Sequence, residues 1–102
     1  PHSKNVYWMY HMVLKPNEKL FNKRNEICKE LSKKGIETRQ GFVPFNLQRI
    51  FIDKKMTKPN DCPNANAISG SSFYIPTGPD ISEKELKYVA SNFLEIIDKL
   101  IN

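Results

Sequence analysis

The sequence is poor in the residues that build covalent or metal-held frameworks. Its 102 residues include two cysteines and two histidines. Neither cysteine lies in a C-x-x-C motif or beside a histidine at the spacing of metal ligands. Cys28 falls on the apolar side of a predicted helix and Cys62 opens a predicted turn, so we expect two buried or half-buried free thiols. The sequence predicts neither a disulfide-rich fold nor metal chemistry.

Long apolar runs are absent as well. No stretch approaches the roughly 20 apolar residues of a membrane-spanning helix, and no charged and then apolar leader opens the chain. We therefore expect a soluble, cytoplasmic protein with no membrane partner. Residues 1–4 could begin no helix or strand, and we assign them to a linker or tag remnant before one domain at 5–102. Folded, a chain of this size should expose about 6,000 Å² of surface.

The net positive charge of the chain is modest and is not concentrated in a basic patch. The chain has 16 Lys and Arg against 11 Asp and Glu, a net charge of +5. Much of it lies on one predicted helix, interleaved with glutamates, which is typical of a solvated helix face. Tyr7, Trp8 and Tyr10 could imitate the stacking aromatics of an RNA-binding sheet, but the glycine-rich basic motif of the partner strand is missing. No nucleic-acid partner is predicted.

Hydrophobic patterning predicts a small sheet packed with helices. Strands are expected at residues 5–14, 36–43 and 72–75, and helices at 19–34, 45–52, 63–69 and from 82 to the end. Gly35 follows the first helix where a terminating glycine would stand, and Ser82 with Glu85 forms a capping box for the last. A polar, mobile loop is expected at 53–60. This order predicts an α+β domain with a sheet of about three strands.

The first predicted strand is apolar on both faces. A strand of that kind must be covered on both sides, and in so small a domain one cover would come from another domain or subunit. His11 lies within this strand among aromatic residues. We expect it to be a hydrogen-bonded core histidine rather than a catalyst.

One short segment has chemistry that packing does not require. The chain has no glycine-rich phosphate loop, no Ser-His-Asp arrangement and no paired carboxylates in a predicted cleft. In Thr38–Pro44, however, Arg39 precedes a glycine and two apolar residues. A guanidinium group binds phosphate or carboxylate through paired hydrogen bonds. The alternative is a surface arginine paired with Glu37 or with an acidic loop residue.

Several segments resemble, in order and spacing, the carboxy-terminal small domain of the DegT/DnrJ/StrS sugar aminotransferases. They are Asn5–Tyr10, Gly35–Arg39, Leu47–Gln48, Ser72–Pro79 and Ile81–Leu86. The resemblance runs in this order over nearly the whole chain, with the lysine-rich loop at 53–60 as its variable part. The run Tyr7-Trp8-Met9-Tyr10 is most similar to perosamine-synthase-like members, which act on a GDP-linked sugar.

The resemblance implies the small domain of a fold type I enzyme that depends on pyridoxal 5′-phosphate (PLP). Such an enzyme transfers an amino group from glutamate to a nucleotide-linked 4-keto-6-deoxy sugar, for surface polysaccharide or antigen sugars. Its Schiff-base lysine belongs to a large amino-terminal domain. The resemblance therefore implies PLP in a homodimeric parent, none bound to this chain alone, and no activity without the large domain.

The resemblance also implies a substrate contact in the segment that contains the arginine. The residues that would approach the substrate are Thr38, Arg39, Gln40, Gly41 and Phe42. None is assigned a catalytic role. The family often has a histidine or a bulky aromatic residue at Gly41 and a histidine at Asn46, so the chain lacks a side chain that would lean on the sugar and a titratable group.

Two other readings remain open from the residues alone. One is a free-standing α+β binding module, nucleic-acid-binding or regulatory, and the other is a separately encoded subunit that completes a partner enzyme. Binding to a phosphate backbone would weaken steeply as salt rises. An inert small domain would have no such binding to lose.

Overall fold

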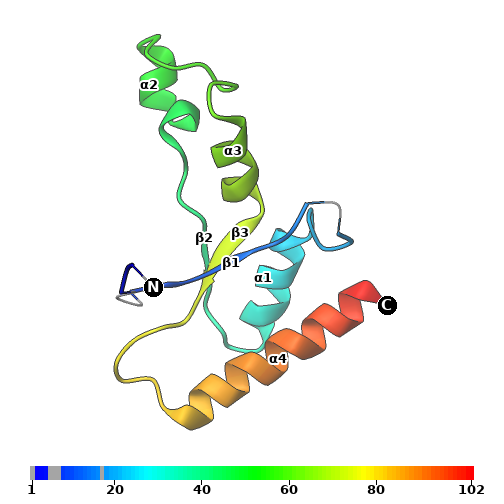
Figure 1. Cartoon of the computed structure of the whole chain (residues 1–102). Coiled ribbons are helices and arrows are strands. Elements are labelled where there is room, and N and C mark those ends of the chain that lie inside the picture. Colours follow the sequence, from blue (N-terminus) through cyan, green and yellow to red (C-terminus); the bar gives the residue numbers. More distant parts are fainter. Residues whose placement is uncertain (1, 5–7, 17) are drawn as a thin grey trace.

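The structure is a computed structural model that describes residues 2–4, 8–16 and 18–102. Three strands, β1 (Tyr10–Val13), β2 (Arg39–Gln40) and β3 (Ser72–Ile75), form one sheet (Figure 1). The α-helices are α1 (Arg24–Lys33), α2 (Arg49–Asp53), α3 (Pro63–Gly70) and α4 (Glu83–Ile101), and a 3-10 turn, η1 (Phe45–Leu47), precedes α2. The predicted α+β class is confirmed.

The sheet has the order β1-β3-β2, and both outer strands run antiparallel to β3. Two strands are shorter than the sequence predicted. The strand predicted at 5–14 is β1, from Tyr10 to Val13, with residues 5–7 outside the described part, and the strand predicted at 36–43 is the two-residue β2. β1 pairs with all four residues of β3 and is limited by it, because Pro76, which has no N–H to donate, follows β3 directly. β2 pairs with only Tyr74 and Phe73 of β3.

The ends of the helices agree with the predicted capping residues, whereas helical composition alone did not locate the start of α1. The helix predicted from residue 19 begins at Arg24, because the preceding residues form turns in which Phe21 N donates to Glu18 O and Lys23 N to Leu20 O. The left-handed Gly35 (φ 76°) follows it as predicted. The capping box of α4 is confirmed: Glu85 N donates to Ser82 Oγ at 3.1 Å, and Ser82 N donates to Glu85 Oε1 at 3.4 Å.

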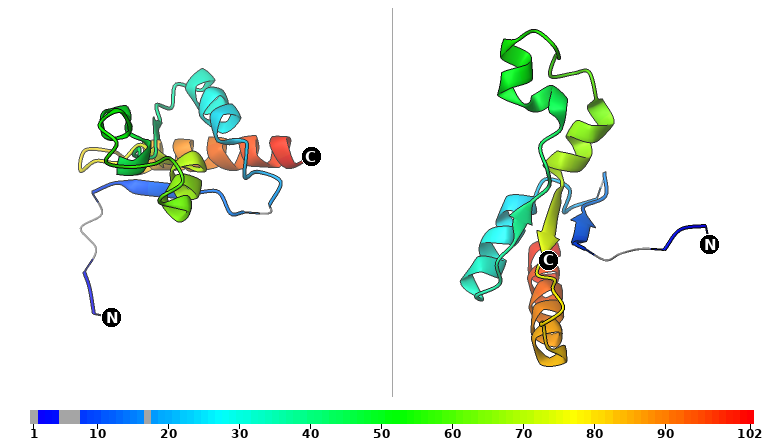
Figure 2. Two further views of the ribbon diagram at one scale, coloured as in Figure 1. Left: turned by 90° about the horizontal axis from the view of Figure 1, so that it is seen from above. Right: turned by 90° about the vertical axis from the view of Figure 1, so that its left-hand side faces the viewer.

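The core lies between the sheet and two helices. Helices α1 and α4 lie on the same side of the sheet (Figure 2), and their apolar residues enclose Phe73 of β3, which is fully buried. The buried apolar residues are Leu14, Ile27, Leu31, Ile36, Phe73, Val89 and Ile96. Cys28 is half-buried against this core, as expected. Cys62 is exposed, contrary to the prediction, because it directly precedes α3 on the surface.

Residues 43–70, which contain η1, α2 and α3, form an arm that projects from the end of the sheet (Figure 1). Asn46 is buried in it and donates from Nδ2 to Pro59 O and to Asn66 Oδ1, each at 2.8 Å. These bonds tie the loop after α2, predicted as mobile, to both sides of the arm. At the base of the arm, Arg24 Nη1 donates to Ser69 O at 2.7 Å.

The arm makes the chain more extended than a compact domain. The radius of gyration is 16.0 Å, against about 13 Å for a compact domain of this length. The exposed surface is 8298 Å², well above the roughly 6,000 Å² expected from the mass. The prediction of an ordinary compact surface was therefore wrong. The excess includes apolar side chains on the arm, namely Val43, Phe45, Ile50, Met56 and Ile68.

The isolated chain is expected to self-associate as its concentration rises, because apolar patches of this kind are rarely left in water by monomeric proteins. Sedimentation velocity over a range of concentrations measures this. Phe45, at 70% exposure the most exposed apolar residue of the arm, gives the test variant Phe45→Asp, which should shift the distribution toward monomer. Lys87→Asp, on the polar side of α4, is the control and should not. A clean monomer of the wild-type chain at high concentration would contradict the prediction.

Candidate recognition surface on the open sheet face

The face of the sheet that α1 and α4 leave uncovered carries one row of side chains across all three strands. His11 of β1 pairs with Tyr74 of β3, and Tyr74 pairs with Arg39 of β2. Residues paired directly across antiparallel strands point to the same face. Phe73, the neighbour of Tyr74, points to the opposite face and into the core. We call this uncovered side, with His11, Tyr74 and Arg39, the open face.

Aromatic contacts order this row. The rings of His11 and Tyr74 stack with centroids 4.6 Å apart and an interplanar angle of 21°. The ring of Phe42, from the segment after β2, lies 5.4 Å from that of Tyr74 at 47°. His11 is exposed, so the expectation of a core histidine was wrong. The cause is register, because His11 lies on the open face while the next residue, Met12, packs against the core.

Tyr74 stands between two hollows. One, of about 400 Å³, is lined by residues that include Arg39, Glu37, Met9 and Pro76. The other, of about 380 Å³, is lined by residues that include His11, Phe42 and Ser72, and Tyr74 borders both. Volumes of this size are in the range of small-molecule sites.

Arg39 has no acidic partner within the part of the chain that the structure describes. No carboxylate lies within 4.0 Å of its guanidinium group, although Glu37 lines the same hollow. The alternative of an arginine paired with Glu37 therefore finds no support. An exposed guanidinium group beside a hollow is available for a bidentate contact with an anionic ligand.

The other residues of the predicted site do not all lie on the open face. Phe42 is exposed and reaches Tyr74, so it joins Arg39 on the open face. Gln40 pairs with Phe73 and so belongs to the opposite side of β2. Thr38 is half-buried before the strand. The substrate contacts of all five residues stay predictions.

Gly41 is buried at a point where the backbone after β2 lies very close to the first residue of β3. Its N–H donates to Ser72 O at 3.1 Å. A Cβ atom at this position would clash with Ser72 Oγ and lie 3.4 Å from Ser69 O. Ser72 is itself fully buried, and its hydroxyl has no hydrogen-bond partner among the described residues. The place of the side chain that the family often has here is therefore occupied by Ser72 of β3.

Gly41→Ala is expected to lower the free energy of unfolding by about 1–3 kcal/mol, because the methyl group overpacks the contact with Ser72. Urea denaturation followed by circular dichroism measures the loss. Gly70→Ala is the matched control, since a Cβ there meets nothing within 4 Å. Ser72→Ala removes the clashing hydroxyl, so the double variant should recover much of the loss. Equal stability of the Gly41 and Gly70 variants would contradict the close-approach interpretation.

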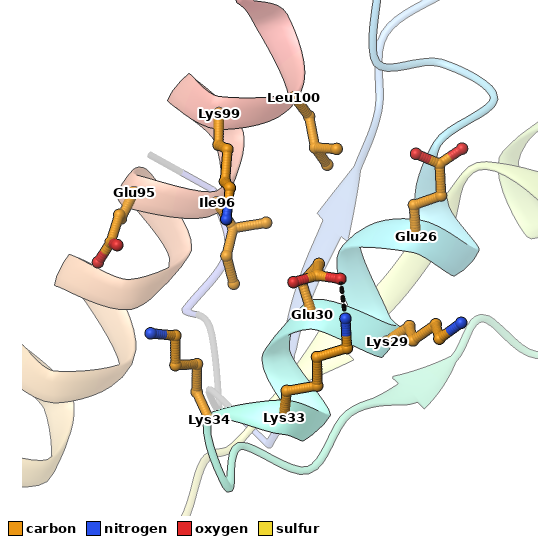
Figure 3. A pocket seen from close by; sticks show the side chains of 9 residues that line it. All are labelled: Glu26, Lys29, Glu30, Lys33, Lys34, Glu95, Ile96, Lys99 and Leu100. Atoms are coloured by element: carbon orange, nitrogen blue, oxygen red, sulfur yellow. Dashed lines mark hydrogen bonds and ion pairs between the residues drawn. The ribbon is translucent and has the colours of Figure 1, made fainter.

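A further hollow, of about 400 Å³, lies between α1 and α4 and is lined by charged residues (Figure 3). Lys33 Nζ donates to Glu30 Oε1 at 2.6 Å, and this bond lowers the pKa of the Glu30 carboxyl below its ordinary value. Its lining alternates four lysines with three glutamates, over Ile96 and Leu100. We interpret it as the solvated seam between two helices.

The lysines of the chain do not offer a covalent cofactor site. Every described lysine is exposed except the half-buried Lys23, which pairs with Glu26 at 3.4 Å. A Schiff-base lysine needs an enclosed pocket that holds the cofactor. The residues present therefore do not fit PLP as a covalently held group. Among the described residues, no group of three or more histidine, cysteine, aspartate or glutamate side chains could hold a metal ion.

Sequence reasoning missed two members of the open face. His11 was assigned to the core, and Tyr74 was treated as part of a short strand and of a segment that resembles the family, with no role at the site. Neither has a local chemical motif, and their proximity to Arg39 follows from strand pairings between residues far apart in the chain, His11 with Tyr74 and Tyr74 with Arg39. The double-sided apolar pattern of the first strand was the available signal. Its alternation set His11 and Val13 on one face and Met12 on the other, without showing which face the helices of the chain would cover.

The fold and the sequence place the chain in a known class. The model of the DegT/DnrJ/EryC1/StrS aminotransferase family matches residues 1–94. The chain belongs to this family.

Solved structures of one protein show the same fold. They are those of a protein described as a sugar aminotransferase, Spr1654 from Streptococcus pneumoniae. Its PLP form matches with a TM-score of 0.78 at 21% identity over 92% of this chain. Its PMP form matches with a TM-score of 0.77 at 22% identity over 90% of this chain. The chain spans 22–23% of the length of these relatives. No curated protein matches the sequence, and no described helix is long and apolar enough to cross a membrane.

Proposed function

We propose that the chain is the carboxy-terminal small domain of a PLP-dependent aminotransferase. The complete enzyme transfers an amino group from glutamate to a nucleotide-linked 4-keto-6-deoxy sugar, for surface polysaccharide synthesis in the cytoplasm. Family membership supports the reaction class, and the length of the structural relatives, more than four times that of the chain, supports a large domain elsewhere in the protein. PLP, held by that domain, would carry the amino group between donor and acceptor.

The observation that carries this proposal is the open sheet face. It has hollows, an unpaired guanidinium group and aromatic side chains, yet no element of the described chain covers it. The chain also exposes roughly 2,000 Å² more surface than a complete domain of its mass. A small domain that forms one wall of a cleft needs such a face. The large domain would form the other wall and cover the arm, in a homodimeric enzyme.

Reading the coding sequence upstream of Pro1 is the first test. We expect the frame to continue for a few hundred residues and to contain a lysine in a serine-rich cofactor motif. A start codon directly before Pro1 would contradict the proposal for this chain and would favour the free-standing module.

The second test is activity. The complete protein should form 2-oxoglutarate from glutamate in the presence of a GDP-linked 4-keto-6-deoxy sugar, whereas residues 1–102 alone should form none. Activity of the short chain would contradict the assignment of the catalytic groups to the large domain. An inactive complete protein that holds PLP, tested with GDP-, UDP- and dTDP-linked keto sugars, would contradict the substrate class.

A further inference from the structure

We propose that His11 and Phe42 form the platform on which the base of the nucleotide-linked substrate stacks, with Tyr74 as the residue that positions both rings. This inference rests on the proposed function and names residues for it. The three rings meet on the open face, and all three line the hollow of about 380 Å³ beside the arm.

The roles of the rings follow from their contacts. His11 covers one face of the Tyr74 ring at 4.6 Å, and Phe42 approaches the same ring at 5.4 Å. Tyr74 is half-buried, and its ring contacts both other rings. We therefore assign it the role of positioning them. His11 is exposed and Phe42 is 65% exposed, so both keep aromatic surface free for a ligand. Aromatic surface of this kind stacks with a planar base whatever its identity.

The position of Arg39 indicates where the phosphates of the nucleotide would bind. Arg39 lies in the same row as His11, on the other side of Tyr74. With neighbouring strands about 4.8 Å apart, the backbones of His11 and Arg39 are on the order of 10 Å apart. A nucleoside diphosphate that stacks its base at His11 and extends along the row would bring its phosphates toward Arg39. The guanidinium group has no carboxylate within 4.0 Å in the described chain, so it is available for them.

The surface favours one nucleotide over a polymer. Arg39 is the one cation in this row of three side chains, and the hollow beside His11 and Phe42 is lined by no lysine or arginine. A groove for single-stranded nucleic acid would instead follow the backbone with repeated positive charge. One stacking platform with one cation suits a single base and its phosphates.

The test is binding of free GDP and free UDP to the complete protein, by isothermal titration calorimetry. His11→Ala and Phe42→Ala should each raise the dissociation constant about 10-fold, since each removes a stacking ring. Tyr74→Leu should raise it similarly, whereas Tyr74→Phe, which keeps the ring, should stay within about 2-fold of wild type. Val13→Ala, on the same face of β1 but outside the row, is the control and should change nothing. Circular dichroism establishes that each variant is folded.

Kinetics separate recognition from a merely structural role. The base is remote from the carbonyl that is aminated, so His11→Ala and Phe42→Ala should raise KM for the nucleotide sugar and leave kcat nearly unchanged. Folded His11→Ala and Phe42→Ala variants with wild-type dissociation constants would overturn the inference and assign the rings to packing against another part of the protein. The binding of free GDP or UDP is measured without any amino transfer, so it does not depend on the activity of the enzyme. An enzyme that binds GDP through these rings but transfers no amino group would therefore overturn the proposed function alone.

Discussion

Phe73→Ala is expected to lower the free energy of unfolding by about 3–5 kcal/mol, the largest loss of any single core truncation in this chain. Phe73 is fully buried in the central strand, and its ring lies 6.2 Å from that of Phe93 in α4. Its removal leaves a cavity between the sheet and both helices. Since domains of this size are stable by only about 5–15 kcal/mol, much of the margin would disappear.

Urea denaturation of the 102-residue chain, followed by far-ultraviolet circular dichroism at low concentration, measures this loss. Phe42→Ala is the matched control, because the same atoms are removed from a side chain that is 65% exposed. That variant should change stability by no more than about 0.5 kcal/mol. A similar loss for both variants would show that the core is not organised around Phe73.

Arg39→Ala is expected to lower kcat/KM of the complete enzyme for the nucleotide sugar by about 10- to 150-fold, with the fold intact. The range corresponds to the loss of a hydrogen bond to a charged group, about 1.5–3 kcal/mol. Arg39 is exposed and has no acidic partner within 4.0 Å in the described chain, so its removal should not change stability. Arg39→Lys should recover only part of the loss, since an ammonium group cannot make the paired contact.

Steady-state kinetics with varied sugar nucleotide test this, and Arg49→Ala is the matched control. The side chain of Arg49 is 92% exposed on the arm and pairs with Asp53 at 3.7 Å, away from the open face. Its removal should leave kcat/KM unchanged. Equal losses for the two arginines would indicate a general effect of charge and would contradict a specific contact at Arg39.

The fold could be predicted where local chemistry decides the structure. Ser82 and Glu85 fix the start of α4, and Gly35 follows α1 in the left-handed conformation. Strand lengths could not be predicted, because apolar residues continue beyond the point where a strand has a partner. The four residues of β3 limit β1, and β2 pairs with only two of them, which the pairing alone shows. The start of α1 was also misjudged, since residues with helical composition form turns before Arg24.

In the candidate site, too, the residues marked by local sequence could be predicted, and the residues brought together by strand pairing could not. Arg39 could be singled out because an arginine before a glycine and two apolar residues is unusual in a short strand, and Phe42 followed from the resemblance to the family. His11 and Tyr74 could not, because each becomes notable only when the register places them in one row. Gly41 was interpreted only as the loss of a side chain that would lean on the sugar, and the structure shows that Ser72 of β3 leaves no room for one. No sequence pattern links those two residues.

The arm joins the sheet through two short links, one directly after β2 and one directly before β3. Gly41 and Ser72 hold these links together where they leave the sheet. A change in the angle of the arm must therefore be absorbed by backbone torsions within a few residues of Arg39 and Tyr74. A change in the angle of the arm would therefore also change the shape of the hollow that Tyr74 and Phe42 line.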